Sequence, residues 1–187
     1  MATDVRYKTV GPMIYFGAGF VWLLSFFCSG HTVNIGTLYN TLISIDIGGA
    51  LIPTILAIVL LLKAQNYYQL LGGVALAILL CFFSSTMDEI GPRTHLLIPV
   101  LIFVIFSFKY IKCNSANAGY CMGTLGAIIG ADILNLSHIP ELHADEIIIG
   151  GAGITDGVFV TGAATWALIV LSEQLLQQRK RHSIIQR

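Results

Sequence analysis

The stretch Ile147–Gly162, IIIGGAGITDGVFVTG, decides the fold. It is apolar enough to enter a lipid bilayer, yet it contains Asp156 with no cation near it in the sequence. The glycines around this carboxyl let another backbone approach closely. An ionisable group inside a membrane span costs about 2.5–3.5 kcal/mol on insertion scales, so we interpret Asp156 as a functional residue.

The composition predicts an integral membrane protein. Of its 187 residues, 56% are hydrophobic and 11% charged, with a mean hydropathy of +0.80, whereas soluble domains carry about 25% charged residues. We therefore expect one membrane domain over residues 1–187. No basic patch interleaved with aromatics points to nucleic acid, no motif points to a cofactor, and the four cysteines lack zinc spacing, so we expect neither a cofactor nor a metal.

We predict an all-α, polytopic bundle with glycine-rich close packing and about six membrane-spanning helices, since a span needs about 20 mostly apolar residues. The six predicted spans cover residues 11–28, 40–62, 67–85, 95–110, 117–136 and 147–171, followed by a cytoplasmic tail at 172–187.

The basic residues predict the orientation in the membrane. With six spans, one side of the bilayer collects Arg6, Lys8, Lys63, Lys109, Lys112, Arg179, Lys180, Arg181 and Arg187, and the other side holds only Arg93. Cytoplasmic loops carry the excess of Lys and Arg. We therefore predict a multi-pass protein of the cell membrane with both termini in the cytoplasm.

Three acidic residues fall within the predicted spans. At about 1.5 Å rise per residue, Asp46, Asp132 and Asp156 all belong to the outer half of the bilayer. Three costly groups at similar depth are most easily explained by one shared, outward-facing cavity built by the second, fifth and sixth spans. Asn135 lies one turn after Asp132 and is placed to hydrogen-bond on the same face.

Small residues accompany each acid. A row of Gly123, Gly126 and Gly130 precedes Asp132 at helical spacing and permits tight helix contact. The pattern IxIGGAxI occurs twice, at Ile45–Ile52 and Ile147–Ile154. Those two spans point the same way, so the pattern is not an inverted transporter repeat.

Three blocks carry a family resemblance: IDIGGALIP at Ile45–Pro53, GTLGAIIGADILNL at Gly123–Leu136 and IGGAGITDGVFVTG at Ile149–Gly162. Together they resemble a prokaryotic membrane-protein family catalogued as domain of unknown function 1614. The family pattern matches Asp132 and Asp156, and usually has Asn at the position of Asp46. The resemblance implies no established activity.

A looser resemblance, in the arrangement of the acids, is to the GxGD intramembrane aspartic proteases. Those enzymes place one Asp in a span and a second in a glycine-rich motif on a following span. Here Asp132 and Asp156 lie on successive spans, and Gly153-Ile154-Thr155-Asp156 is similar to the motif. Thr155 replaces the second glycine, and no Tyr-Asp pair precedes Asp132.

Two carboxyls at one site share a proton, because like charges in a low dielectric do not both ionise cheaply. The first hypothesis is therefore an aspartic hydrolase of membrane peptides with Asp132 and Asp156 as catalytic residues. The supporting or ion-binding residues are Asp46, Asn135, Gly150, Gly151, Gly153 and Thr155.

The same acids serve a second hypothesis, a small proton- or cation-coupled transporter or channel. Thr161 and Thr165 either line its path or bond back to their own helix. The apolar runs AIVLLL and ALIVL in the inner halves favour a one-sided site instead. A third hypothesis is a non-catalytic scaffold, a homo-oligomer through glycine-rich helix faces.

The outer loop Ser137–Glu146, SHIPELHADE, offers five metal donors: His138, Glu141, His143, Asp145 and Glu146. Their spacing fits no helical zinc motif, so we interpret the loop as a solvated acidic segment, with gating or metal capture as the alternative. The run RKRH at Arg179–His182 marks a cytoplasmic end in contact with anionic lipid.

Overall fold

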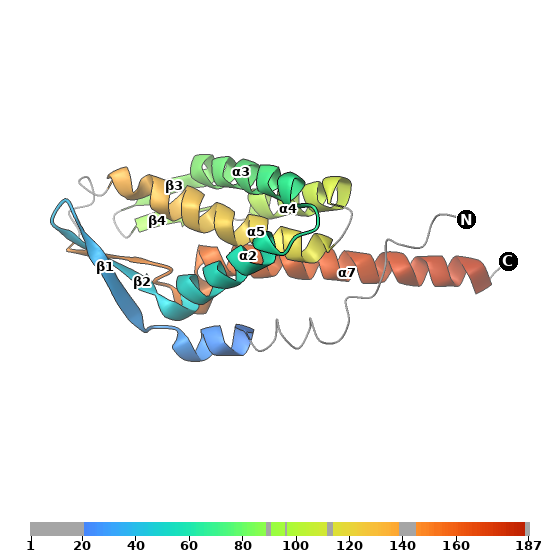
Figure 1. Ribbon diagram of the computed structural model, residues 1–187, viewed down its shortest axis with the longest axis horizontal. Coiled ribbons are helices and arrows are strands. Elements are labelled where there is room, and N and C mark those ends of the chain that lie inside the picture. Colours follow the sequence, from blue (N-terminus) through green and yellow to red (C-terminus); the bar gives the residue numbers. More distant parts are fainter. Residues whose placement is uncertain (1–20, 89–90, 96, 112–113, 139–144, 186–187) are drawn as a thin grey trace.

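The computed structural model describes residues 21–88, 91–95, 97–111, 114–138 and 145–185. Its helices run roughly lengthwise in a bundle, with α2, α4 and α7 pointing one way and α3 and α5 the other (Figure 1). Residues 21–28 are also helical. The main helices are α2 (Ile52–Leu62), α3 (Tyr67–Ser84), α4 (Leu97–Tyr110), α5 (Ser115–Gly126) and α7 (Gly157–Ile185).

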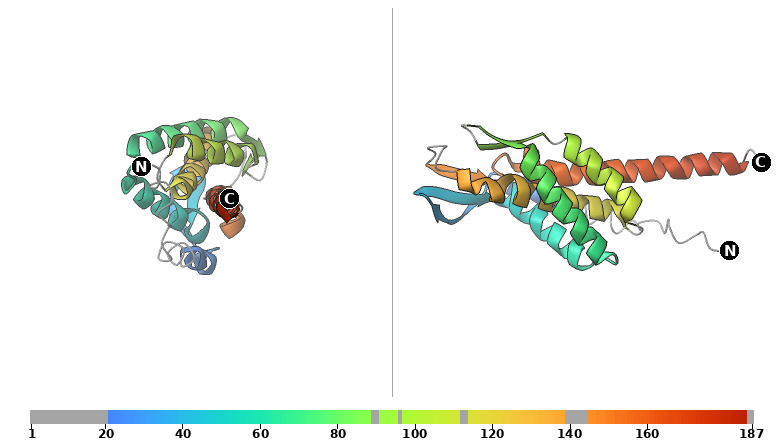
Figure 2. Two further views of the ribbon diagram at one scale, coloured as in Figure 1. Left: turned by 90° about the vertical axis from the view of Figure 1, so that its right-hand side faces the viewer. Right: turned by 90° about the horizontal axis from the view of Figure 1, so that it is seen from above.

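Helix α5 is the centre of the bundle. It contacts α2, α3, α4 and α7, and the end-on view of Figure 2 shows it surrounded by them. Its sequence SANAGYCMGTLG is poor in bulky side chains, and all its residues from Ala118 to Gly126 are buried. Small residues suit this position because they let four neighbours approach one backbone.

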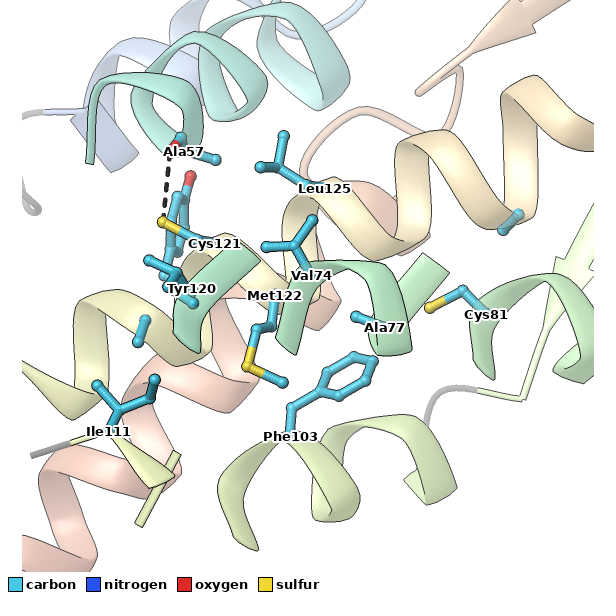
Figure 3. Packing of buried hydrophobic residues seen from close by; sticks show 13 residues of the cluster. Ala57, Val74, Ala77, Cys81, Phe103, Ile111, Tyr120, Cys121, Met122 and Leu125 are labelled. Carbon is cyan, nitrogen blue, oxygen red and sulfur yellow. Dashed lines mark hydrogen bonds between the residues drawn. The ribbon is translucent and has the colours of Figure 1, made fainter. Parts of the chain in front are cut away.

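The largest apolar cluster lies between α5 and its neighbours (Figure 3). Met122 and Cys121 of α5 are fully buried, as are Phe103 of α4 and Ala57 of α2. The Cys121 thiol donates to the Ala57 carbonyl at 3.3 Å, so even this polar group is satisfied within the core.

The fold is mostly helical, as predicted, but the all-α prediction is wrong at one end of the bundle. Strands β1 (Thr32–Leu38), β2 (Thr41–Asp46) and β5 (Glu146–Ile149) form a sheet in the order β1-β2-β5. The β1–β2 pair is antiparallel and the β2–β5 pair is parallel. A second antiparallel pair joins β3 (Ser85–Asp88) to β4 (Gly91–Thr94).

The boundaries of two predicted spans change as a result. The first residues of the 40–62 span form β2, and a π-helical segment η1 (Ile47–Leu51) then leads into α2. In the 147–171 span, β5 and a 3-10 turn η4 (Gly153–Thr155) precede α7. Helix α7 continues to Ile185, so the predicted tail at 172–187 is helical as far as that residue.

Three helices are long and apolar enough to cross a membrane: Tyr67–Ser84, Ser115–His138 and Gly157–Arg179. Ile47–Leu62 and Leu97–Tyr110 are shorter apolar helices. These segments are compatible with a membrane protein, and the count of six spans stays a prediction. Residues 11–20 of the first predicted span lie outside the described residues.

Glycines of α5 lie against other helices of the same chain. A Cβ on Gly123 would lie 2.6 Å from the Thr161 carbonyl oxygen and 2.8 Å from Gly162 Cα, both in α7. A Cβ on Gly126 would lie 2.8 Å from Ala77 Cβ in α3. These contacts hold α5 close to two neighbours, and an oligomer through glycine faces stays a prediction.

Candidate functional site

The three predicted acids come together where the sheet meets the bundle. Asp46 ends β2, Asp156 directly precedes α7, and Asp132 lies in the π-helical segment η2 (Ala127–Ile133) that extends α5. The carboxyls of Asp132 and Asp156 are near enough for their charges to repel, and so are those of Asp156 and Asp46. Elements far apart in the sequence thus assemble one acidic cluster, which we define as Asp46, Asp132 and Asp156.

Asp46 is the structural member of this cluster. Only 1% of it is exposed, and both carboxyl oxygens accept backbone hydrogen bonds. Oδ1 accepts from Gly49 N and caps η1, and Oδ2 accepts from Gly30 N at 2.7 Å. A carboxylate at a helix N-terminus is stabilised by the unpaired N–H groups and the helix dipole.

Asp156 caps α7. Its Oδ1 accepts from Val158 N at 2.9 Å, and its carboxylate also accepts from the backbone of Ala152. The residue is extended, with φ −66° and ψ 150°, which is the usual backbone conformation of an N-cap. Asp156 is therefore at the start of a helix. The sequence had indicated a position within a helix, in the predicted span 147–171.

Asp132 differs from the other two acids in its hydrogen bonding. Its Oδ2 is buried and has no hydrogen-bond partner among the described residues. Cys81 of α3, fully buried, lies within range of its charge. A buried acceptor without a donor costs about 1–3 kcal/mol, so this oxygen is the one unsatisfied position of the acidic cluster.

The helix around Asp132 is irregular. It changes from α to π over Ala127–Ile133 and then to a 3-10 segment, η3 (Leu134–His138). Isolated π turns occur frequently at functional sites, and here η1 and η2 both adjoin acids of the cluster. Asn135 is buried and donates to the Ala131 carbonyl at 2.7 Å, so its amide supports the end of its own helix.

The glycines near Asp156 pack against the chain itself. Gly150 and Gly153 have positive φ, +73° and +62°, which favours glycine. A Cβ on Gly49 would meet the carbonyl oxygens of Gly150 and Gly153, so η1 and the turn before Asp156 are in backbone contact. Gly151 N closes this turn on Ile148 O at 3.1 Å.

Thr155 and the repeated pattern have local roles. Thr155 is exposed, and its hydroxyl donates to the Ala152 carbonyl at 2.7 Å. The two IxIGGAxI strings meet in the parallel β2–β5 pair, but Ile45 pairs with Ile149 rather than with Ile147. The strings are therefore offset by two residues, and the first continues as η1 where the second forms a turn.

The outer loop contributes no metal cluster among the residues that the structure describes. Glu141 and His143 lie outside them. Glu146 is engaged in the sheet, where its Oε1 accepts from Ser44 Oγ at 2.8 Å.

A fourth acid, Glu173, was not predicted as a site residue because it lies in the predicted tail. It lies in α7, half-buried, and its carboxyl is close to the side chain of Ser115 at the start of α5. The Ser115 hydroxyl donates to Ile111 O at 3.5 Å. The signal that could have found it is spacing: positions 161, 165, 169 and 173 are four apart, so each neighbours the next along one slowly turning row of the helix.

Comparison with known proteins identifies a family for this chain but no individual relative. No curated protein and no solved structure matches the chain. The profile of one family matches residues 18–168, which covers most of the sequence and includes the whole acidic cluster. The family resemblance predicted from the three sequence blocks is thereby confirmed, and the chain belongs to the family described as "Protein of unknown function (DUF1614)".

Proposed function

We propose that the protein is a small integral membrane carrier in which the Asp132–Asp156 pair takes up and releases a proton. The observation that carries this proposal is the buried Oδ2 of Asp132, which has no partner among the described residues and lies in reach of the Asp156 charge. For two carboxyls so placed, the state that shares one proton is lower in free energy than the state in which both are ionised.

The surroundings divide the roles within the pair. Asp156 accepts backbone hydrogen bonds at the N-terminus of α7, an arrangement that stabilises a negative charge. Asp132 offers the unsatisfied acceptor, Oδ2, so the shared proton binds to this oxygen. Asp46, with both oxygens hydrogen-bonded, holds the two glycine-rich segments in place.

The proposed orientation places the acidic cluster on the outer side of the membrane. Lys63 follows the last residue of α2, Lys109 lies in the last turn of α4, and Arg179 lies near the end of α7. These three helices run the same way (Figure 1), so their basic ends all point away from the sheet, and that of α7 projects beyond the other two. Because basic ends face the cytoplasm, the sheet and the acidic cluster face outward.

Infrared spectroscopy tests the proposed proton site. A protonated carboxyl in a buried setting gives its own C=O stretch, and we expect this band to appear on acidification of the purified protein in lipid. Asp132→Asn is expected to remove the band, and Asp156→Asn to remove or strongly shift it, because the pair shares the proton. The exposed Asp145 supplies the matched control, Asp145→Asn, which should keep the band. A band that persists unchanged in both cluster variants contradicts the proposal.

Peptide hydrolysis is the second candidate function, favoured by the interaction between the Asp132 and Asp156 charges. In that reaction one carboxylate activates water while its protonated partner polarises the peptide carbonyl. Gly150 and Gly153, which we had expected to admit a substrate backbone, instead contact Gly49 and Ala50, so we rank this function second. Cleavage of reconstituted single-span peptides, lost at least about 100-fold in both Asp→Asn variants, would establish it.

A further inference from the structure

Buried hydroxyls follow the acidic cluster along the contact between α5 and α7. Thr161 and Thr165 of α7 are fully buried and one turn apart. Thr161 Oγ1 donates to Gly157 O at 2.6 Å, and Thr165 Oγ1 donates to Thr161 O at 2.7 Å. Thr124 of α5, also fully buried, meets α7 at Gly162.

The row continues with a third helix. A Cβ on Gly119 of α5 would lie 2.8 Å from Thr165 Cγ2 and 3.5 Å from the hydroxyl of Ser107. Ser107 belongs to α4 and is fully buried. Ser107 and Thr165 therefore both approach Gly119, Thr165 with its methyl group. The Ser107 hydroxyl donates to Met122 Sδ of α5 at 3.8 Å.

A carboxyl stands at each end of this interface. The Asp132–Asp156 pair lies at the start of α7, and Glu173, close to Ser115, lies sixteen residues after Gly157. At about 1.5 Å rise per residue this separation is about 24 Å, which is most of the thickness of a bilayer's hydrocarbon core. A hydrogen bond back to its own helix explains why each threonine is tolerated when buried. It does not explain why both threonines lie between the acidic cluster and Glu173.

One apolar side chain interrupts the row. Ile169 lies between Thr165 and Glu173 on the same face of α7 and is fully buried. A Cβ on Gly119 would meet its Cδ1, so Ile169 fills the space that the glycine leaves. Ile169 therefore places an apolar side chain between Thr165 and Glu173.

We propose that the α5–α7 interface transfers protons between the Asp132–Asp156 pair and Glu173, with Ile169 as the barrier. The proposal rests on the proposed function and adds the route and the inner acceptor. A hydroxyl accepts a proton on a lone pair while it releases its own, and single waters bridge gaps between such groups. Only O–H bonds form and break: the proton leaves a carboxyl at one end and joins a carboxylate at the other, and no co-reactant is needed.

The test measures proton flux into lipid vesicles that contain the full chain, driven by a potassium diffusion potential and followed with a pH-sensitive dye. Thr165→Val removes the hydroxyl at nearly constant shape and is expected to slow the flux about fivefold to tenfold, the effect of one buried hydrogen-bonding group. Glu173→Gln is expected to slow it by at least as much, and Ile169→Ala to raise it.

Ser172→Ala is the matched control, because Ser172 also bonds one turn back in α7, to Leu168 O at 2.7 Å, but its bond is exposed. It is expected to leave the flux unchanged. The infrared band of the outer pair is recorded in every variant. A band that persists while flux falls in Thr165→Val and Glu173→Gln supports the route and shows that both variants are folded.

Two results overturn the route. One is a wild-type flux no greater than that of protein-free vesicles. The other is a flux that Thr165→Val and Glu173→Gln leave at the wild-type level. In either case a persisting carboxyl band leaves the proposed outer site intact, whereas its absence from the wild type removes the proposed function as well.

Discussion

At the scale of single residues, the three acids of the cluster differ in their hydrogen bonds. Asp46 and Asp156 accept from backbone N–H groups that helix starts leave unpaired. Asp132 lies within an irregular helix and keeps an unsatisfied oxygen. Sequence reasoning identified all three positions, but it assigned them similar surroundings because it placed each inside a membrane span.

Replacing Asp46 tests its structural role. Asp46→Ala leaves Gly30 N and Gly49 N without their acceptor and is expected to destabilise the protein by about 2–3 kcal/mol, the sum of a lost cap and a lost buried bond to a charged group. Asp46→Asn keeps one acceptor and is expected to cost less. Thermal unfolding in detergent measures both, with exposed Asp145→Ala as the control. Equal midpoints for all three variants would contradict the assignment.

At the scale of secondary-structure elements, α5 determines the packing because four helices share its surface. Its glycine spacing in the sequence predicted a close helix contact, and the structure identifies the contacted elements as α7 at Gly123 and α3 at Gly126. The strands were missed. TLISID is apolar with β-branched residues, and a short apolar run that leads into a helix does not by itself distinguish a strand from another helical turn.

The contact between α5 and α7 is tested by adding one methyl group. Gly123→Ala would place a Cβ 2.6 Å from Thr161 O and 2.8 Å from Gly162 Cα, and overpacking of this kind costs about 1–3 kcal/mol. Gly72 of α3 is the matched control, since nothing lies within 4 Å of its Cβ position. Gly72→Ala is expected to be neutral or to stabilise by up to about 1 kcal/mol. A stable Gly123→Ala protein would mean that α5 and α7 lie farther apart.

At the scale of the whole molecule, the helices α2, α4 and α7 run away from the strands, with α7 extending well past the other two, and α3 and α5 run back toward the strands (Figure 1). This alternation agrees with the order of the predicted spans. The positive-inside rule then predicts that the basic end faces the cytoplasm. The same arrangement gives the proposed proton route a direction, from an acidic outer end to Glu173 near the basic end.

Reporter fusions in a bacterial host test this orientation. A fluorescent protein that folds only in the cytoplasm is expected to be active after residue 64, between α2 and α3, and after the last residue. Alkaline phosphatase, which is active only outside, is expected to work after residue 138, beyond η3. The opposite pattern at all three points would invert the molecule, and a mixed pattern would refute the alternation of the helices.

The sequence by itself determined the family, and it predicted a membrane character and three acidic site candidates, because these depend on composition and on local residue patterns. Only the tertiary structure decided which groups each acid contacts. The parallel pairing of β2 with β5 joins residues about one hundred positions apart, and it brings the start of η1 beside the turn before Asp156. Likewise, Glu173 comes close to Ser115 only because α7 continues past its predicted end and runs beside the start of α5. Such contacts depend on how close two distant backbones approach, and no local pattern of residues records that distance.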